Sequence, residues 1–250
     1  MILERIIRRE RATVAAVLGL ITVACWAWLV PMARDMYGAM TGPSAWMMTD
    51  TWDGSHLLLL GAMWIVMMTG MMLPSAAPTL LVYAAAMRRR GAAGNVYAMA
   101  AGYVLVWVGF SAWAVLLQRV LSSWLLLSPM MTATTPVLSG GLLVLAGIYQ
   151  FTPLKRMCVG SCSAPVVFLM RRWREGTAGA FRLGIEHGLF CLGCCWALML
   201  LLFAGGIMNL AVIGAITAVI LFEKLTPMGG RSVRFTGAAL VLLGGWVIRN

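Results

Sequence analysis

The sequence contains little charge. Of its 250 residues, 11% are charged and only eight are acidic, whereas an ordinary soluble domain carries about 25% charged residues. Hydrophobic residues make up 62% of the chain, and the mean hydropathy is +0.90. A soluble domain would leave too much of this apolar surface in water. The composition therefore predicts an integral membrane protein, with the lipid bilayer as its solvent.

Several functional motifs are also absent from the sequence. It has no Walker motif, no glycine pattern for nucleotide binding and no Ser/His/Asp constellation for hydrolysis. These absences argue against an ATP-driven pump and against an enzyme of the hydrolase class. No soluble domain, low-complexity tail or internal repeat interrupts the apolar pattern. We therefore expect residues 1–250 to form a single integral membrane helical domain.

Seven apolar runs predict the architecture. They cover residues 12–30, 56–73, 95–117, 135–151, 183–204, 207–222 and 235–248. A membrane-spanning helix needs about 20 residues, so the fourth, sixth and seventh runs are short. The second run continues past Pro74 and Pro78 to Met87, and we expect it to kink or protrude. The fold class is thus all-α: a polytopic transmembrane helical bundle of about seven spans, with a range of six to eight.

Basic residues are distributed unevenly among the connections between these runs. The net charge is +11, and 16 of the 19 basic residues fall on one predicted side, leaving only Arg34, Arg119 and Arg249 on the other. Because positive residues stay in the cytoplasm, we expect a cytoplasmic N-terminus and a multi-pass protein of the bacterial inner (plasma) membrane. The first run is too long for a signal peptide and is interpreted as an uncleaved anchor. The basicity is a topology signal and predicts no nucleic-acid partner.

Five of the six cysteines lie close together in the sequence. Cys158 and Cys162 form one pair, and His187 precedes a second group made of Cys191, Cys194 and Cys195. On a helix, the second group covers an arc of about 100° and therefore faces one way. Polar and thiol side chains at this spacing inside an apolar run are more typical of chemistry than of packing.

Thiolates favour soft metals, among them Cu(I) and zinc. His187 and Cys195 are about 12 Å apart along a helix axis, too far for one ion to bind every side chain in the group. A compact subset, Cys191, Cys194 and Cys195, can share an ion with ligands from Cys158 and Cys162. We expect the two groups to meet at the inner boundary of the bilayer.

Other polar residues in the apolar runs have simpler interpretations. Cys25, alone in the first run, is interpreted as a packing residue. Glu186 either pairs with a nearby arginine such as Arg182 or belongs to a site or proton relay. Glu223 and Lys224 lie at the end of a run, where snorkelling explains them, and we assign them no chemistry.

The chain is rich in methionine, with 20 residues. Met63, Met67 and Met71 follow one another at i, i+4 spacing in the second run, with Met68 and Met72 beside them. Thioethers bind Cu(I) without deprotonation, so this ladder is a secondary set of candidate ligands; the alternative is adaptable packing between helices. Further methionines lie in or near predicted outward-facing connections: Met32, Met36, Met40, Met47, Met48, Met130, Met131 and Met208.

Four sequence segments resemble a known family. These are M67‑MTGMMLPSAAP78, Y149‑QFTPLKRMCVGSCSAP165, F168‑LMRRWREGTAGAFRLGIEHGLFCLGCCWALML200 and G205‑GIMNL210 with the pair E223‑K224. Over residues 56–245 the chain is similar to the predicted metal-binding integral membrane protein family, which includes the copper chaperone of a bacterial polyphenol oxidase. The resemblance implies membrane-embedded copper binding and delivery to exported copper enzymes. It implies Cys158, Cys162, His187, Cys191, Cys194 and Cys195 as ligands.

The leading hypothesis is a non-enzymatic copper chaperone. It takes Cu(I) with the thiols and His187, passes it toward outer methionines and supplies a recipient copper oxidase or membrane complex. Zinc is the alternative metal. A structural or assembly subunit of a larger membrane complex is a second hypothesis, and the many glycines suit its close helix contacts. A membrane thiol-disulfide oxidoreductase using the Cys191–Cys194 CxxC motif is a third.

Overall fold

The computed structural model describes residues 2–38, 52–88, 90, 92–128, 131–226 and 230–250, with the side chains of residues 2–11 and Arg88 left out. Within this part of the chain the fold is all-α, without a β-strand. The helices are α1 (Ile2–Met36), α3 (Gly54–Arg88), α4 (Asn95–Ser123), α5 (Pro136–Gln150), α6 (Pro153–Ser163), α7 (Pro165–Arg172), α8 (Gly176–Met199), α9 (Leu201–Gly205), α10 (Leu210–Leu225) and α11 (Gly230–Arg249).

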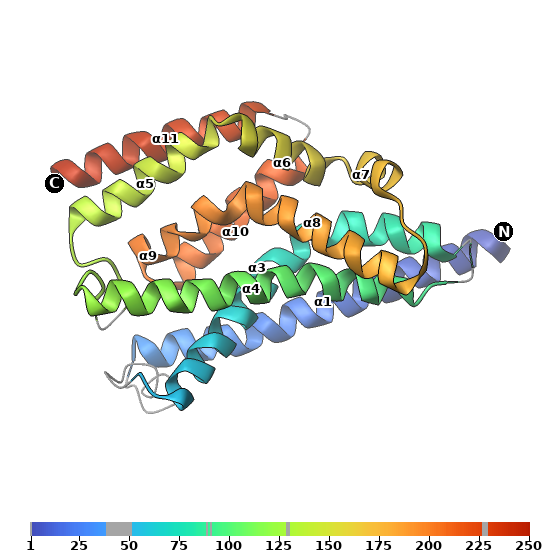
Figure 1. The fold of residues 1–250 in the computed structure, drawn as a ribbon, viewed down its shortest axis with the longest axis horizontal. Helices are drawn as coiled ribbons and strands as arrows, with labels where there is room; N and C mark the ends of the chain where they lie inside the picture. Colours follow the sequence, from blue (N-terminus) through green and yellow to red (C-terminus); the bar gives the residue numbers. More distant parts are fainter. Residues whose placement is uncertain (1, 39–51, 89, 91, 129–130, 227–229) are drawn as a thin grey trace.

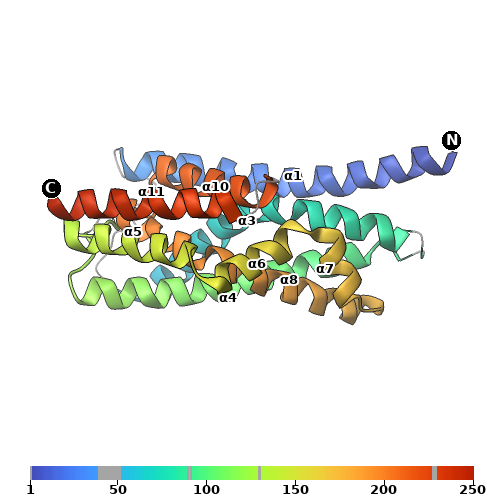
Figure 2. The ribbon, with the colours of Figure 1, turned by 90° about the horizontal axis from the view of Figure 1, so that it is seen from above.

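The helices form an elongated bundle. Helices α1, α3, α4 and α8 run along its long axis, and the two chain termini lie at opposite ends (Figure 1). Neighbouring pairs are α1 with α3, α3 with α4, α4 with α8, and α5 with α11. Figure 2 shows the α5–α11 pair from a second direction, together with the short helices α6 and α7 beside α8. Since α6 packs directly on α8, the two cysteine-bearing segments lie next to each other.

Glycines allow α4 and α8 to approach closely. A Cβ atom at Gly184 would lie 2.0 Å from the carbonyl oxygen of Met99, and one at Gly102 would lie 2.2 Å from the carbonyl oxygen of Phe181. No side chain fits at such distances, so both positions require glycine. Small residues at helix contacts are typical of bundles in membranes, where close backbone packing replaces the hydrophobic drive that operates in water. This contact fixes the position of α8, the helix that carries most of the candidate ligands.

Each of the seven predicted apolar runs is largely helical, although the sixth begins with the non-helical residues 207–209 and the fifth is interrupted at Leu200. Five helical segments are long and apolar enough to cross a membrane: 12–36, 54–87, 95–123, 176–205 and 230–249. The fourth run forms α5, which is followed by α6 after a bend of 69°, and the pair counts as a sixth candidate if it is one broken span. The sixth run forms α10, which has only 16 residues.

Local sequence explains two of the breaks and one bend. The Thr152 side chain accepts a hydrogen bond from the Lys155 backbone N–H, and Pro153 occupies the first turn of α6, so a new helix begins directly after α5. Asn209 caps α10 in the same way. Helix α3 contains Pro74 and Pro78 and bends along its length (Figure 1). An internal proline removes a helical hydrogen bond, which accounts for the expected kink.

Candidate metal centre

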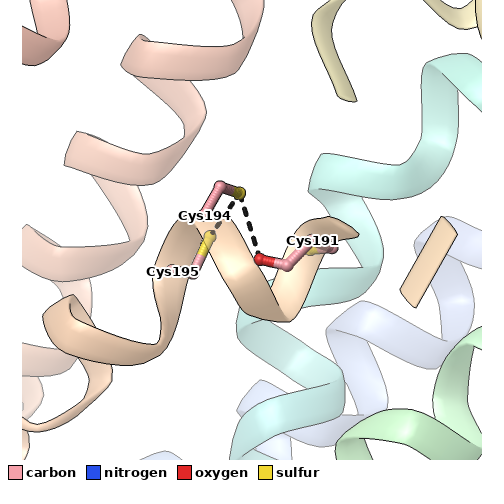
Figure 3. A group of neighbouring side chains, drawn as sticks. All are labelled: Cys191, Cys194 and Cys195. Carbon is pink, nitrogen blue, oxygen red and sulfur yellow. Dashed lines mark hydrogen bonds between the residues drawn. The ribbon is translucent and has the colours of Figure 1, made fainter. Parts of the chain in front are cut away.

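The centre of the candidate site is a group of three thiols on α8. The sulfur atoms of Cys191, Cys194 and Cys195 lie within 4.8 Å of one another, and all three side chains are buried. Cys194 Sγ is 3.2 Å from Cys195 Sγ and also donates to the Cys191 carbonyl oxygen at 3.0 Å (Figure 3). A metal–sulfur bond of about 2.3 Å permits two ligand sulfurs to be up to ~4.6 Å apart. The three thiols are thus already close to the separation that one soft ion requires.

Cys191 lies at the junction of four helices. Lys224 Nζ of α10 donates to Cys191 Sγ at 2.8 Å and to Ser75 Oγ of α3 at 3.0 Å. The Tyr103 hydroxyl of α4 lies 3.0 Å from the same sulfur and donates to the Met72 carbonyl oxygen at 2.9 Å. A sulfur that accepts a hydrogen bond from an ammonium group is stabilised as a thiolate, the form that binds metals.

A buried ion pair lies beside the thiol group and contacts the backbone of α8. Lys155 Nζ of α6 donates to Glu223 Oε2 and to the Cys194 carbonyl oxygen, both at 2.6 Å. Gln150 Nε2 donates to the other carboxylate oxygen of Glu223 at 2.8 Å. The Lys155 side chain is fully buried, and that of Glu223 is 2% exposed. This network joins α6 and α10 to the backbone of α8 at the thiol group.

The interpretation of Glu223 and Lys224 as snorkelling residues is therefore wrong. Both side chains are buried and point inward, Glu223 to Lys155 and Lys224 to Cys191. Lys155, which the sequence assigns to a basic connection, is buried in the same way. Their partners lie on other helices and far away in the sequence, so the sequence pattern alone does not reveal these contacts. The available signal is that all three charges stand close to strongly apolar runs.

The two cysteines of α6 contribute differently. The Cys162 thiol is buried and interacts with the thiols of Cys191 and Cys194. Cys158 is also buried, but a Cβ atom at Gly193 would lie 2.8 Å from its sulfur. Gly193 stands on another face of α8 from the three clustered thiols. Of the α6 pair, Cys162 is therefore the one that faces the thiol group, but its sulfur does not belong to the set of donor atoms that lie within 4.8 Å of one another.

His187 lies one turn before Cys191 on α8. Its ring packs between Phe168 of α7, with a centroid distance of 5.1 Å, and Tyr103, with a centroid distance of 5.6 Å. The side chain is 2% exposed, and Nδ1 has no hydrogen-bond partner among the described residues. A buried nitrogen without a partner is costly unless it binds something, so Nδ1 is one of the donor atoms that could hold a metal ion. His187 does not belong to the group whose donor atoms lie within 4.8 Å of one another.

Glu186 and Cys25 have structural partners. Glu186 pairs with Arg172 at 3.2 Å and with Arg174 at 2.8 Å, so the expected arginine partners exist, although they lie on the α7 side and not at Arg182. Cys25 packs against Gly70, where an added Cβ atom would lie 2.9 Å from the Cys25 Cβ atom. Neither residue takes part in the thiol group.

The methionine ladder lies inside the bundle. Met63, Met67 and Met71 of α3 are fully buried, as are their neighbours Met68 and Met72. Of the methionines predicted in or near outward-facing connections, four are buried: Met32, Met36, Met131 and Met208. The others lie outside the described residues: Met40, Met47, Met48 and Met130.

The site offers soft donors on buried side chains. Three thiols lie at metal-binding separation, Cys162 adds a fourth thiol beside them and His187 adds an unpaired nitrogen. Soft sulfur ligands suit Cu(I) and zinc, whereas Mg²⁺ and Ca²⁺ prefer oxygen ligands, which this group lacks. The donor set is compatible with binding of a thiophilic metal ion.

Comparison with known protein families gives a match over most of the chain. The family described as "PpoB2: Copper chaperone" matches residues 61–247. This range contains α4 to α10 complete and most of α3 and α11. It includes every cysteine except Cys25 and all the groups that contact the thiols. No curated protein and no solved structure matches the chain. On the extent of the family match, the chain belongs to the PpoB2 copper chaperone family.

Proposed function

We propose that this chain is a non-enzymatic, membrane-embedded copper chaperone that binds Cu(I) at Cys191, Cys194 and Cys195. The observation that carries the proposal is the mutual proximity of these three buried sulfurs, within 4.8 Å, in a chain of the copper chaperone family. Copper is the cargo in this account and zinc is the competing metal. The recipient is a copper-using oxidase or membrane complex.

The proposed entry side is the end of the bundle that carries the N-terminus. The α3–α4 and α7–α8 connections lie at the same end (Figure 1), and the exposed Arg90 and Arg174 belong to them. By the positive-inside rule this end is cytoplasmic, and the seven apolar segments then place the C-terminus outside, in a bacterial inner membrane. His187 precedes the thiol group on α8, on the side of the entry end, and in this proposal it receives the ion first.

The proposed exit route is the methionine row on α3. Met71, Met67 and Met63 are fully buried and lead from the level of the thiols toward the opposite end of the bundle. Thioethers are neutral ligands that bind Cu(I). A row of them can therefore accept the ion from the thiols without placing a negatively charged ligand along the route. Transfer along this row delivers copper to the outer face.

Metal analysis of the purified full chain tests the binding step. We expect copper to co-purify with the wild-type protein and to be lost when Cys191, Cys194 and Cys195 are together replaced by serine. The Cys25→Ser variant is the matched control, because that cysteine packs against Gly70 away from the site. His187→Ala should retain copper with reduced affinity. Equal copper content in the triple variant and the control would refute the proposal.

A further inference from the structure

The methionine row and the thiol group meet at a lysine. Met63, Met67 and Met71 are spaced at i, i+4, and Ser75 is the next position in the same row. Ser75 Oγ accepts from Lys224 Nζ at 3.0 Å, and the same nitrogen is 2.8 Å from Cys191 Sγ. The row therefore ends where the ammonium group of Lys224 contacts the first thiol.

The positive charge of Lys224 is not balanced by a carboxylate. Its sequence neighbour Glu223 has both oxygens engaged, one by Lys155 at 2.6 Å and the other by Gln150 at 2.8 Å. No ion pair of Lys224 with a carboxylate occurs within the described ranges. The Lys155–Glu223 pair is neutral as a unit, and the ammonium group of Lys224 is held by Cys191 Sγ and Ser75 Oγ.

From this placement, and resting on the function proposed above, we propose that Lys224 is a cationic gate between the thiol group and the methionine row. In the proposed transfer, Cu(I) leaves Cys191 past Ser75, whose hydroxyl lies 3.9 Å from Cys191 Sγ, and then reaches Met71 one turn earlier on α3. An ammonium group at that position repels the ion, and both groups are buried, where like charges interact more strongly than in water. Copper stays on the thiols until Lys224 withdraws from Ser75.

The size of the barrier follows from Coulomb's law. Two unit charges about 5 Å apart at an effective permittivity of ~20 repel each other enough to change a rate by a factor on the order of 10². A neutral side chain of similar size at position 224 removes this term. An arginine keeps the charge and should keep the barrier.

The experiment measures copper release from the full chain. Wild type, Lys224→Met and Lys224→Arg are loaded with Cu(I), reconstituted into phosphatidylcholine vesicles and mixed with a membrane-impermeant colorimetric Cu(I) chelator. The triple variant Met63→Leu/Met67→Leu/Met71→Leu lacks the thioethers of the row. The kinetic phase of copper release that is lost in this variant is the phase that uses the row. We expect Lys224→Met to accelerate that phase about 10- to 100-fold over wild type, and Lys224→Arg to leave it close to the wild-type rate.

A second variant tests the gate independently if Lys224→Met does not fold. Ser75→Asp places a carboxylate beside the ammonium group, which neutralises the gate while Lys224 stays in place, and it should accelerate the same phase. Wild-type release rates in the folded Lys224→Met or Ser75→Asp protein would overturn the gate. If wild type binds no copper, or if the triple leucine variant releases it normally, the proposed function or its route fails instead.

Discussion

Replacing Lys155 with methionine should strongly destabilise the protein. Lys155 and Glu223 form a fully buried ion pair with an N–O distance of 2.6 Å, and Lys155 also binds the carbonyl oxygen of Cys194. Removing the lysine leaves the Glu223 carboxylate buried with Gln150 as its remaining hydrogen-bond donor. An uncompensated buried charge costs about 3–5 kcal/mol. For a chain of this size that corresponds to a fall of roughly 10 °C in the unfolding temperature.

The assay is thermal unfolding of the detergent-solubilised full chain, followed by circular dichroism. Arg174→Met is the matched control, because Arg174 also pairs with a glutamate, Glu186, but its side chain is 47% exposed. A pair so exposed contributes about 0–1 kcal/mol, and Glu186 keeps its contact with Arg172, so this variant should unfold close to the wild-type temperature.

The double variant Lys155→Met/Glu223→Gln separates charge from packing. It leaves no buried charge at this position, so it should recover at least half of the loss seen in the single variant. Our reasoning is refuted if Lys155→Met unfolds at the same temperature as Arg174→Met. It is also refuted if the double variant is less stable than the single one.

Three further predictions follow from the same contacts. Gly184→Ala should prevent α4 and α8 from docking, because its Cβ atom would meet the Met99 carbonyl oxygen at 2.0 Å, whereas Gly109→Ala, which has open space, should give a normal yield of monodisperse protein in size-exclusion chromatography. Tyr103→Phe removes the hydroxyl beside the Cys191 sulfur and should weaken Cu(I) binding about 10- to 100-fold in chelator competition. Cys25→Ser should leave that affinity unchanged.

The sequence predicts the helices better than it predicts their roles. Apolar runs locate the five helices of the described residues that are long and apolar enough to cross a membrane, because a segment that crosses lipid must satisfy its own backbone hydrogen bonds as a helix. The N-caps Thr152 and Asn209 are local signals that mark the starts of α6 and α10. The sharp bend between α5 and α6 has a local cause in Pro153, which begins α6. Apolarity predicts only the run 135–151, which corresponds to α5, and gives no sign of the short helix that follows it.

The surroundings of the thiols could not be predicted in the same way. The helical spacing of Cys191, Cys194 and Cys195 places them on one face, and the structure has their sulfurs close together. Lys224, however, reaches Cys191 from a helix 33 positions later in the sequence. Such contacts depend on which helices pack together, and hydropathy carries no information about that choice. A charged residue near the end of an apolar run looks the same whether it snorkels or turns inward.

X-ray absorption at the copper edge of the Cu(I)-loaded full chain tests the central claim most directly. Copper bound by the α8 thiols should show two or three sulfur ligands at about 2.3 Å. This sulfur shell should disappear when Cys191, Cys194 and Cys195 are replaced by serine. A coordination shell made of nitrogen and oxygen, or a sulfur shell that survives the triple replacement, would contradict the account.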